Sequence, residues 1–178
     1  MKAEIVKNKE EIFKGPVFDI VRLDVEVEDG SQQNRDLLLH RGGACIVAIN
    51  EKHEIYLVRQ YRIAVEQFSL EVPAGKLELG EDPIECAYRE LEEECGVRAD
   101  KLELLNKFFP TPGYSNEAIY IYYCDSYQNT EQNLDDGEFL EVYKVHIDDA
   151  YELILKGEIK DAKTIIAIML AWRKVYSV

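Results

Sequence analysis

The chain has 178 residues, 47% of them hydrophobic and 31% charged, a balance that is typical of a folded soluble protein and excludes a long disordered chain. This length fits one domain of ordinary size with a buried core of its own. The 35 acidic and 21 basic residues give a net charge of −14, and because such a surface repels phosphate backbones, we expect no nucleic acid as the main partner.

Strand signals fill the first half of the chain. Stretches of β-branched and apolar residues are separated by turn signals at Gly15-Pro16 and Asp29-Gly30. Two further apolar runs flank residues 50–53 and are predicted to form a hairpin. The strands expected in this half cover residues 4–13, 17–28, 35–40, 44–49 and 55–60.

A helix is predicted from Asp82 to Cys95. Asp82 can cap the first turn, Pro83 is favoured at the first helical position, and Glu85 completes a capping box. Gly96 supplies the stop. Strands, this inserted helix, more strands and terminal helices predict an α/β protein of the α+β kind, a mixed sheet flanked by helices. The later elements are strands at 102–109, 118–126 and 142–147 and helices at 148–156 and 161–176.

Neither a membrane segment nor a zinc site is expected. The longest apolar stretches, residues 44–49 and 164–172, are far too short to span a bilayer. The first ten residues lack the apolar run of a signal peptide. We therefore expect a cytoplasmic protein with no membrane partner. The four cysteines lack the spacing of a metal site, which favours reduced, partly buried thiols.

One face of the predicted helix 82–95 is strongly acidic. At about 100° per residue, Glu90, Glu93 and Glu94 fall on one arc, beside an apolar stripe that should face the core. Carboxylates at this spacing repel each other unless a hard divalent cation lies among them. Taken alone, such a cluster is usually a plain solvated face. The apolar stripe consists of Ile84, Ala87, Tyr88, Leu91 and Cys95.

The spacing around this face carries more information. Gly75, five residues, Glu81, seven residues and then Arg89-Glu90-Leu91-Glu92-Glu93-Glu94-Cys95-Gly96-Val97 fit G-x5-E-x7-R-E-U-x-E-E-x-G-U, with U aliphatic. The sequence resembles the Nudix superfamily at every specified position of this box. The resemblance implies an α/β/α sandwich. We expect an N-terminal antiparallel β segment over residues 1–40 and a Nudix hydrolase domain over residues 41–178.

The resemblance also implies a metal site. Glu90, Glu93 and Glu94 match the family's metal-ligand glutamates. The carbonyl of Ala74 is expected to point at the same metal, because Gly75 permits a tight turn there. Carboxylate and carbonyl oxygens suit Mg²⁺, with Mn²⁺ as the alternative ion.

Catalytic roles follow from the same resemblance. Glu93 and Glu94 are expected to act in catalysis as well as in metal binding, and Arg89 to orient a neighbouring carboxylate. Glu81 is expected to support the loop or Arg89. The metal would grip the pyrophosphate oxygens, neutralise developing charge and lower the pKa of the attacking water.

Segments outside the box are similar to the ADP-ribose pyrophosphatase subfamily, although GDP-mannose hydrolases share part of the pattern. Arg59 and Arg62 are candidate clamps for the diphosphate, or else a pair of surface salt bridges. Glu71 is expected to bind substrate hydroxyls, to assist the metal site or to form an ion pair with Arg59. The segments are residues 57–62 (LVRQYR), 70–75 (LEVPAG), 112–113 (PG) and 157–164 (GEIKDAKT).

A general base is expected on the polar loop 129–137 or just after it. Glu138 matches the approximate place of the subfamily's catalytic glutamate, and Asp136 and Glu141 are its rivals. Such a loop would close over the substrate and exclude bulk water.

The expected activity is hydrolysis of ADP-ribose, a small nucleoside diphosphate sugar, to AMP and ribose 5-phosphate. The alternatives are another nucleotide substrate, such as GDP-mannose or 8-oxo-dGTP, and a non-hydrolytic domain that senses ADP-ribose or NAD-like ligands. The intact box glutamates disfavour the sensor. The subfamily resemblance further implies a homodimer that exchanges N-terminal strands.

Overall fold

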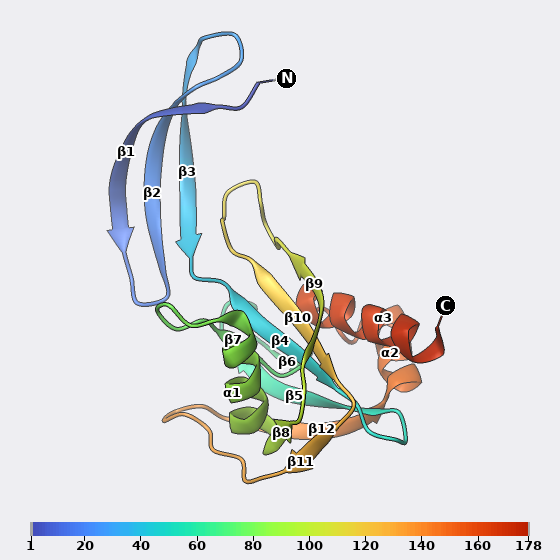
Figure 1. Cartoon of the computed structure of the whole chain (residues 1–178). Helices are drawn as coiled ribbons and strands as arrows, with labels where there is room; N and C mark the ends of the chain where they lie inside the picture. Colours follow the sequence, from blue (N-terminus) through green and yellow to red (C-terminus); the bar gives the residue numbers. More distant parts are fainter. Residues whose placement is uncertain (1, 178) are drawn as a thin grey trace. The chain divides into compact units, whose positions relative to one another are not determined.

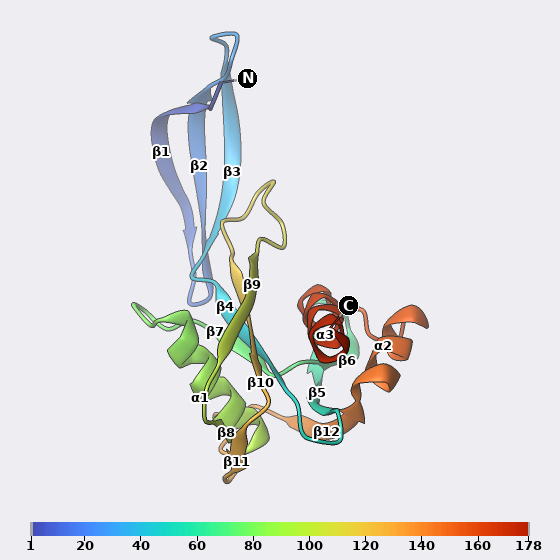
Figure 2. The same ribbon diagram turned by 45° about the vertical axis from the view of Figure 1, so that its right-hand side comes forward.

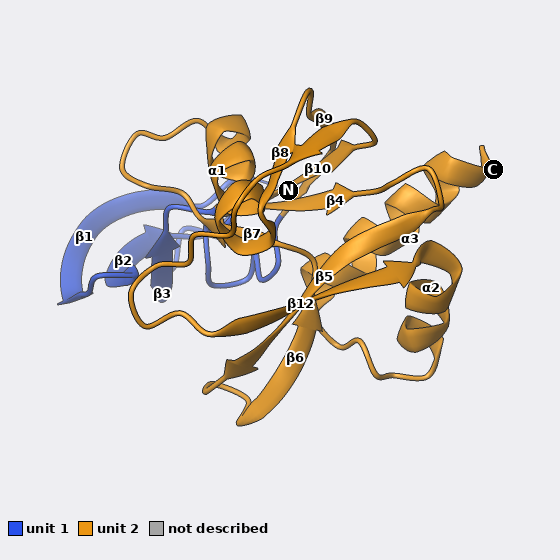
Figure 3. Ribbon diagram, turned by 90° about the horizontal axis from the view of Figure 1, so that it is seen from below, with its two compact units in different colours: residues 1–42, 109–118 blue, residues 43–108, 119–178 orange. Residues whose placement is uncertain are grey.

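The computed structural model describes residues 2–177 and contains two compact units (Figures 1 and 3). Unit 1 comprises residues 1–42 and 109–118, and unit 2 comprises residues 43–108 and 119–178. The expected division into residues 1–40 and 41–178 stays a prediction, and the structure adds that residues 109–118 pack with the N-terminal strands. No helix among residues 2–177 is long and apolar enough to cross a membrane.

Unit 1 is an antiparallel meander with the strand order β1-β2-β3, as the turn signals predict. Val21 and Val25 of β2 are buried, whereas every residue of β1 is exposed. The segment 109–118 lies along strand β3, where the backbone N–H of Leu38 donates to the carbonyl of Tyr114 at 2.8 Å. The strands are β1 (Ile5–Lys14), β2 (Phe18–Glu26) and β3 (Gln32–His40).

Unit 2 contains a four-stranded sheet of order β7-β4-β10-β9 and a three-stranded sheet of order β12-β5-β6, with a small β11-β8 pair. Strands β4 and β10 run parallel and the other pairs antiparallel. The strands are β4 (Gly43–Ala48), β5 (Glu54–Arg62), β6 (Gln67–Glu71), β7 (Ala74–Lys76), β8 (Val97–Ala99), β9 (Glu103–Phe108), β10 (Ile119–Cys124), β11 (Tyr127–Asn129) and β12 (Leu140–His146).

Strand β4 is the centre of the α/β/α sandwich. Its side chains alternate between two hydrophobic clusters, because successive residues of a strand point to opposite faces. Ala44 and Ile46 pack in the cluster with α1 (Pro83–Cys95), and Cys45 and Val47 in the cluster with α2 (Ile147–Leu155) and α3 (Ala162–Tyr176). Figure 2 shows α1 on one side of β4 and β10, and α2 and α3 on the other. The predicted sandwich is confirmed.

One local prediction is wrong. The apolar runs 44–49 and 55–60 were expected to pair as a hairpin, but β4 and β5 belong to different sheets and meet in a single bridge between Ile49 and Ile55. Strand β4 is buried along its whole length, and both of its edges are already paired, one to β10 and the other to β7. The turn at residues 50–53 therefore carries the chain from one sheet to the next.

Candidate active site

Helix α1 begins and ends where its capping residues predict. The Asp82 side chain accepts a hydrogen bond from the backbone N–H of Ile84 at 3.0 Å, and Pro83 is the first helical residue. Gly96 ends the helix in the left-handed conformation with φ 61°. The helix buries Ala87 and Leu91 as expected, and it also buries a glutamate.

That glutamate is Glu94, whose residue is only 1% exposed. Its carboxylate accepts a hydrogen bond from the backbone N–H of Ala74 at 3.0 Å. Burial raises the pKa of Glu94 to about 8, and the charges of Glu90 and Glu138 add to this, whereas the Ala74 N–H and the charge of Arg62 oppose it. The site therefore holds a buried carboxylate that becomes costly to ionise without an added positive charge.

Glu90 lies directly against the backbone of Gly75. A Cβ atom at Gly75 would come within 1.7 Å of Oε1 of Glu90. Gly75 is not among the residues with positive φ, and it pairs with Ala44 in the β7–β4 ladder. The glycine is thus required for space and not, as its place in the box suggested, for a tight turn. The expected role of the Ala74 carbonyl stays a prediction, since the polar contact seen at Ala74 is made by its N–H.

Arg89 organises the other carboxylates of the helix. Its Nη1 donates to Oε1 of Glu90 at 2.7 Å and to Oε2 of Glu93 at 3.0 Å. Its Nε donates to Oε1 of Glu81 at 3.0 Å. Arg89 is thus placed to orient carboxylates, and Glu81 to support Arg89, as the resemblance implies.

The donor set fits a hard divalent cation. Glu90, Glu93 and Glu94 offer carboxylate oxygens from neighbouring turns of one helix, and these are the ligands that Mg²⁺ and Mn²⁺ prefer. Glu94 is buried with a raised pKa, which an adjacent cation would relieve. Within residues 2–177, no three acidic, cysteine or histidine side chains already have the geometry of a metal site. Arg89 holds one oxygen each of Glu90 and Glu93.

The buried Glu71 forms an ion cluster with Arg62 and Lys163. Arg62 donates Nε and Nη2 to the two oxygens of Glu71 at 2.9 and 2.7 Å, and the ammonium of Lys163 also donates to Glu71. Burial alone would raise the pKa of Glu71, but the hydrogen bond from Arg62 and the charge of Lys163 outweigh burial and lower it to about 2. Glu71 thus forms its ion pair with Arg62, and the alternative of an ion pair with Arg59 is wrong.

We predict that Lys163→Met lowers the free energy of unfolding by about 2 kcal/mol, because the buried Glu71 loses a charge-assisted hydrogen bond and keeps only Arg62 as its cation. Lys163 also donates to Asp161 at 3.0 Å, so two carboxylates lose this partner. Urea unfolding at pH 7 measures the effect, with Lys163→Arg as the matched control that keeps the charge. Equal stability of Lys163→Met and the wild type would show that the cluster does not stabilise the fold.

Arg59 faces away from this cluster. Arg59 and Arg62 are three residues apart on β5, and because strand side chains alternate, they point to opposite faces. Arg59 pairs with Glu141, its cross-strand neighbour on β12, at 3.0 Å, and lies 4.1 Å above the ring of Phe68. The two candidate clamps are therefore on different surfaces of the sheet, and each is paired with a carboxylate.

Glu138 is brought into electrostatic range of the helix carboxylates. Its charge contributes to the raised pKa of both Glu90 and Glu94, after burial as the largest cause. Its backbone N–H donates to the carbonyl of Asp135 at 3.0 Å, which closes a turn through Gly137. Its rival Glu141 is engaged by Arg59 on the other face.

Sequence reasoning missed the residues that brace the site. Thr164 is fully buried, and its hydroxyl accepts a hydrogen bond from the backbone N–H of Val72 at 3.0 Å. Together with Lys163 it connects the segment 157–164 to the segment 70–75. In the sequence, both segments stand out only by their similarity to the subfamily. The signal that could have identified Lys163 and Thr164 is their polar character at the start of the apolar helix α3.

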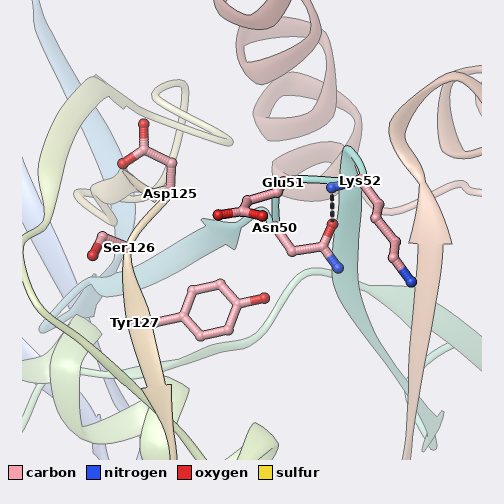
Figure 4. Close-up of a pocket in the computed structure, with 6 residues that line it drawn as sticks. All are labelled: Asn50, Glu51, Lys52, Asp125, Ser126 and Tyr127. Carbon is pink, nitrogen blue, oxygen red and sulfur yellow. Dashed lines mark hydrogen bonds between the residues drawn. The ribbon is translucent and has the colours of Figure 1, made fainter.

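A surface hollow lies elsewhere in unit 2 (Figure 4). It is formed by the turn after β4 and the turn after β10, and the side chain of Asn50 accepts a hydrogen bond from the N–H of Lys52 at 2.9 Å. None of the predicted site residues lines it. Its lining residues are Asn50, Glu51, Lys52, Asp125, Ser126 and Tyr127.

The chain is similar to several known proteins. The family model described as NUDIX domain matches residues 39–168. An ADP-ribose pyrophosphatase of Bacillus subtilis (strain 168) is 39% identical over 162 residues, which cover 90% of this chain and 88% of that protein. A methanol dehydrogenase activator of Bacillus methanolicus is 38% identical over 161 residues, which cover 89% and 87%.

A solved structure shares the fold. The crystal structure of an ADP compounds hydrolase matches with a TM-score of 0.86 and 23% identity, covering 99% of this chain and 97% of the other. The box segment 89–95 lies on the predicted helix, Glu94 is buried there, and the family model spans most of the chain. This protein therefore belongs to the NUDIX domain family.

Proposed function

We propose that this protein hydrolyses the pyrophosphate of ADP-ribose to AMP and ribose 5-phosphate. The observation that carries the proposal is the carboxylate cluster on α1, with Glu94 buried and Glu90 held against Gly75. The similarity to an ADP-ribose pyrophosphatase at 39% identity supports the choice of substrate.

The chemistry proposed for the cluster needs a divalent cation. Glu90, Glu93, Glu94 and the carbonyl of Ala74 would hold Mg²⁺, or Mn²⁺ in its place. When bound, the cation would neutralise charge on the pyrophosphate and lower the pKa of the attacking water. Arg89 keeps Glu90 and Glu93 oriented through its paired hydrogen bonds.

Glu138 is proposed as the general base that accepts the proton of the attacking water. The support is that its charge contributes to the raised pKa of both Glu90 and Glu94. The pairing of Glu141 with Arg59 leaves Glu138 the better placed of the two.

The proposed substrate contacts are Arg59, Arg62 and Glu71. Glu71 holds the guanidinium of Arg62 by two hydrogen bonds, and the positive charge of Arg62 acts to lower the pKa of Glu94. A guanidinium fixed in this way is suited to a diphosphate, because little freedom is lost when the substrate binds. Arg59, stacked above Phe68, offers a cation and an aromatic ring on the opposite face.

We further propose a cytoplasmic homodimer. The support is the edge strand β1 of unit 1, where Ile5, Val6, Ile12 and Phe13 are each about half exposed. An exposed edge strand offers unpaired backbone groups for pairing with another chain. Light scattering at several concentrations tests this, and a monomeric mass throughout would reject the dimer.

A second candidate function comes from the relative that activates methanol dehydrogenase. In that case this protein would raise the activity of a dehydrogenase. The test is the rate of alcohol oxidation by such a dehydrogenase with and without added protein. An effect that survives Glu94→Gln would separate this function from hydrolysis.

The deciding experiment is release of the nucleoside monophosphate in the presence of Mg²⁺ from a panel of substrates. AMP is followed for ADP-ribose, NADH and diadenosine polyphosphates, GMP for GDP-mannose, UMP for UDP-glucose and 8-oxo-dGMP for 8-oxo-dGTP. Selective turnover of ADP-ribose is expected. Preference for another member would keep the chemistry and move the specificity. Binding of ADP-ribose without turnover of any member would favour the sensor and reject the hydrolase.

A further inference from the structure

The loop between β11 and β12 is fastened to the end of helix α1. Figure 1 shows this loop passing beside α1 before it enters β12. The last carbonyls of a helix have no partner within the helix and must find one outside it. Here the side-chain amide of Gln132 donates to the carbonyl of Glu94 at 2.6 Å, and the N–H of Asn133 donates to the carbonyl of Glu93 at 3.0 Å.

Gly96 allows the loop to come this close. Its carbonyl accepts a hydrogen bond from the N–H of Thr130 at 2.7 Å. A Cβ atom at Gly96 would lie 2.9 Å from the backbone N of Gln132 and 3.0 Å from the carbonyl O of Thr130. Gly96 therefore ends the helix and also leaves the space in which the loop packs against it.

The far end of the loop is fastened too. Leu140 begins β12 and pairs with Gln60 of β5. Between the two anchors, the hydrogen bond from Glu138 to Asp135 closes a tight turn. Gln132 and Glu138 are therefore close in sequence, on a loop that is attached to α1 through Gln132 and to β5 through Leu140. Both α1 and β5 carry proposed site residues.

We propose that Gln132 is a positioning residue for Glu138. Its amide fixes the loop on the backbone of Glu94, the residue whose side chain belongs to the carboxylate cluster. The base and the cluster thereby keep a constant separation. This inference rests on the proposed function, because it assigns the purpose of the anchor to the base on the same loop.

The kinetic test is a double-mutant cycle on ADP-ribose hydrolysis. Gln132→Met keeps the length of the side chain and removes the donor. A displacement of about 1 Å at a reacting group costs up to about 100-fold, so we expect kcat to fall between about 10-fold and 100-fold, with KM little changed. In a Glu138→Gln background, Gln132→Met should cause no further fall. Independent losses in the two backgrounds would overturn the inference.

The structural test needs neither metal nor substrate. Amide hydrogen exchange of residues 133–139 should be faster in Gln132→Met than in the wild type. Gln128→Met is the matched control, since Gln128 donates to Asp100 at 3.1 Å, outside this loop. Unchanged exchange and unchanged kcat in Gln132→Met, with an active wild type, would overturn this inference alone. A wild type that turns over no substrate would overturn the proposed function as well.

Discussion

Glu94→Gln is expected to lower ADP-ribose hydrolysis on the order of 10²- to 10³-fold, because the site loses a charged ligand of the proposed cation. The same substitution is expected to stabilise the metal-free protein at neutral pH. Glu94 is 1% exposed, and its ionised form is disfavoured by burial. Glutamine keeps the shape and the acceptor for the Ala74 N–H without the charge. AMP release in the presence of Mg²⁺ measures the loss of activity. Urea unfolding in the presence of a chelator measures the gain in stability.

The stability difference should depend on pH in a defined direction. The pKa of Glu94 is raised from its ordinary value of 4.5 to about 8 in the folded protein. Between these values the folded state binds more protons than the unfolded state, so the wild type loses stability as pH rises. The loss is at most about 1.4 kcal/mol per pH unit. The advantage of Glu94→Gln should therefore grow from pH 4.5 to pH 8 and then level off.

The matched control is Glu92→Gln, on the same helix. Glu92 pairs with Arg98 at 2.6 Å outside the carboxylate cluster, so its removal should leave hydrolysis unchanged. A pH-independent stability difference between Glu94→Gln and the wild type would contradict the burial of a titrating carboxyl at this position. Full activity of Glu94→Gln would contradict its role in the reaction.

Gly75→Ala is expected to separate activity from stability. The added Cβ would lie 1.7 Å from Oε1 of Glu90, so the carboxylate must leave its place. The atom it meets is the end of a flexible side chain, and Gly75 has no positive φ, so the fold can adapt at small cost. We expect hydrolysis to fall about 100-fold or more, as for the loss of a preorganised charge, while the urea midpoint changes little.

Binding of Mn²⁺, followed by calorimetry, should weaken in Gly75→Ala in parallel with activity. Gly113→Ala is the matched control, because no atom lies within 4 Å of a Cβ built there. Wild-type activity in Gly75→Ala would mean that Glu90 works from another position. A large loss of stability would mean that Gly75 serves the strand and not the carboxylate.

Part of this protein was predictable from local patterns. The caps Asp82 and Gly96 gave the bounds of α1, and the turn signals gave the meander of unit 1. These features depend on a few neighbouring residues, whose hydrogen bonds and backbone preferences act within one turn. The box spacing likewise placed Glu90, Glu93 and Glu94 together, because the helical repeat alone brings such positions to one side.

Other features were decided only by tertiary contacts. The run 44–49 was correctly read as a strand, yet its partners are β7 and β10, because a strand buried on both faces carries no local mark of its neighbours. Arg59 and Arg62 looked equivalent in sequence, but their partners come from different neighbouring strands, Glu141 on β12 and Glu71 on β6.

Helix α1, its capping and the carboxylate spacing can be predicted from the sequence alone, since these depend on residues a few positions apart. The contacts of each carboxylate cannot. Glu94 and Ala74 are 20 positions apart in the chain, and Glu71 and Lys163 are 92 apart. Contacts at such separations follow from how whole elements pack, and the burial that raises the pKa of Glu94 arises only when they do.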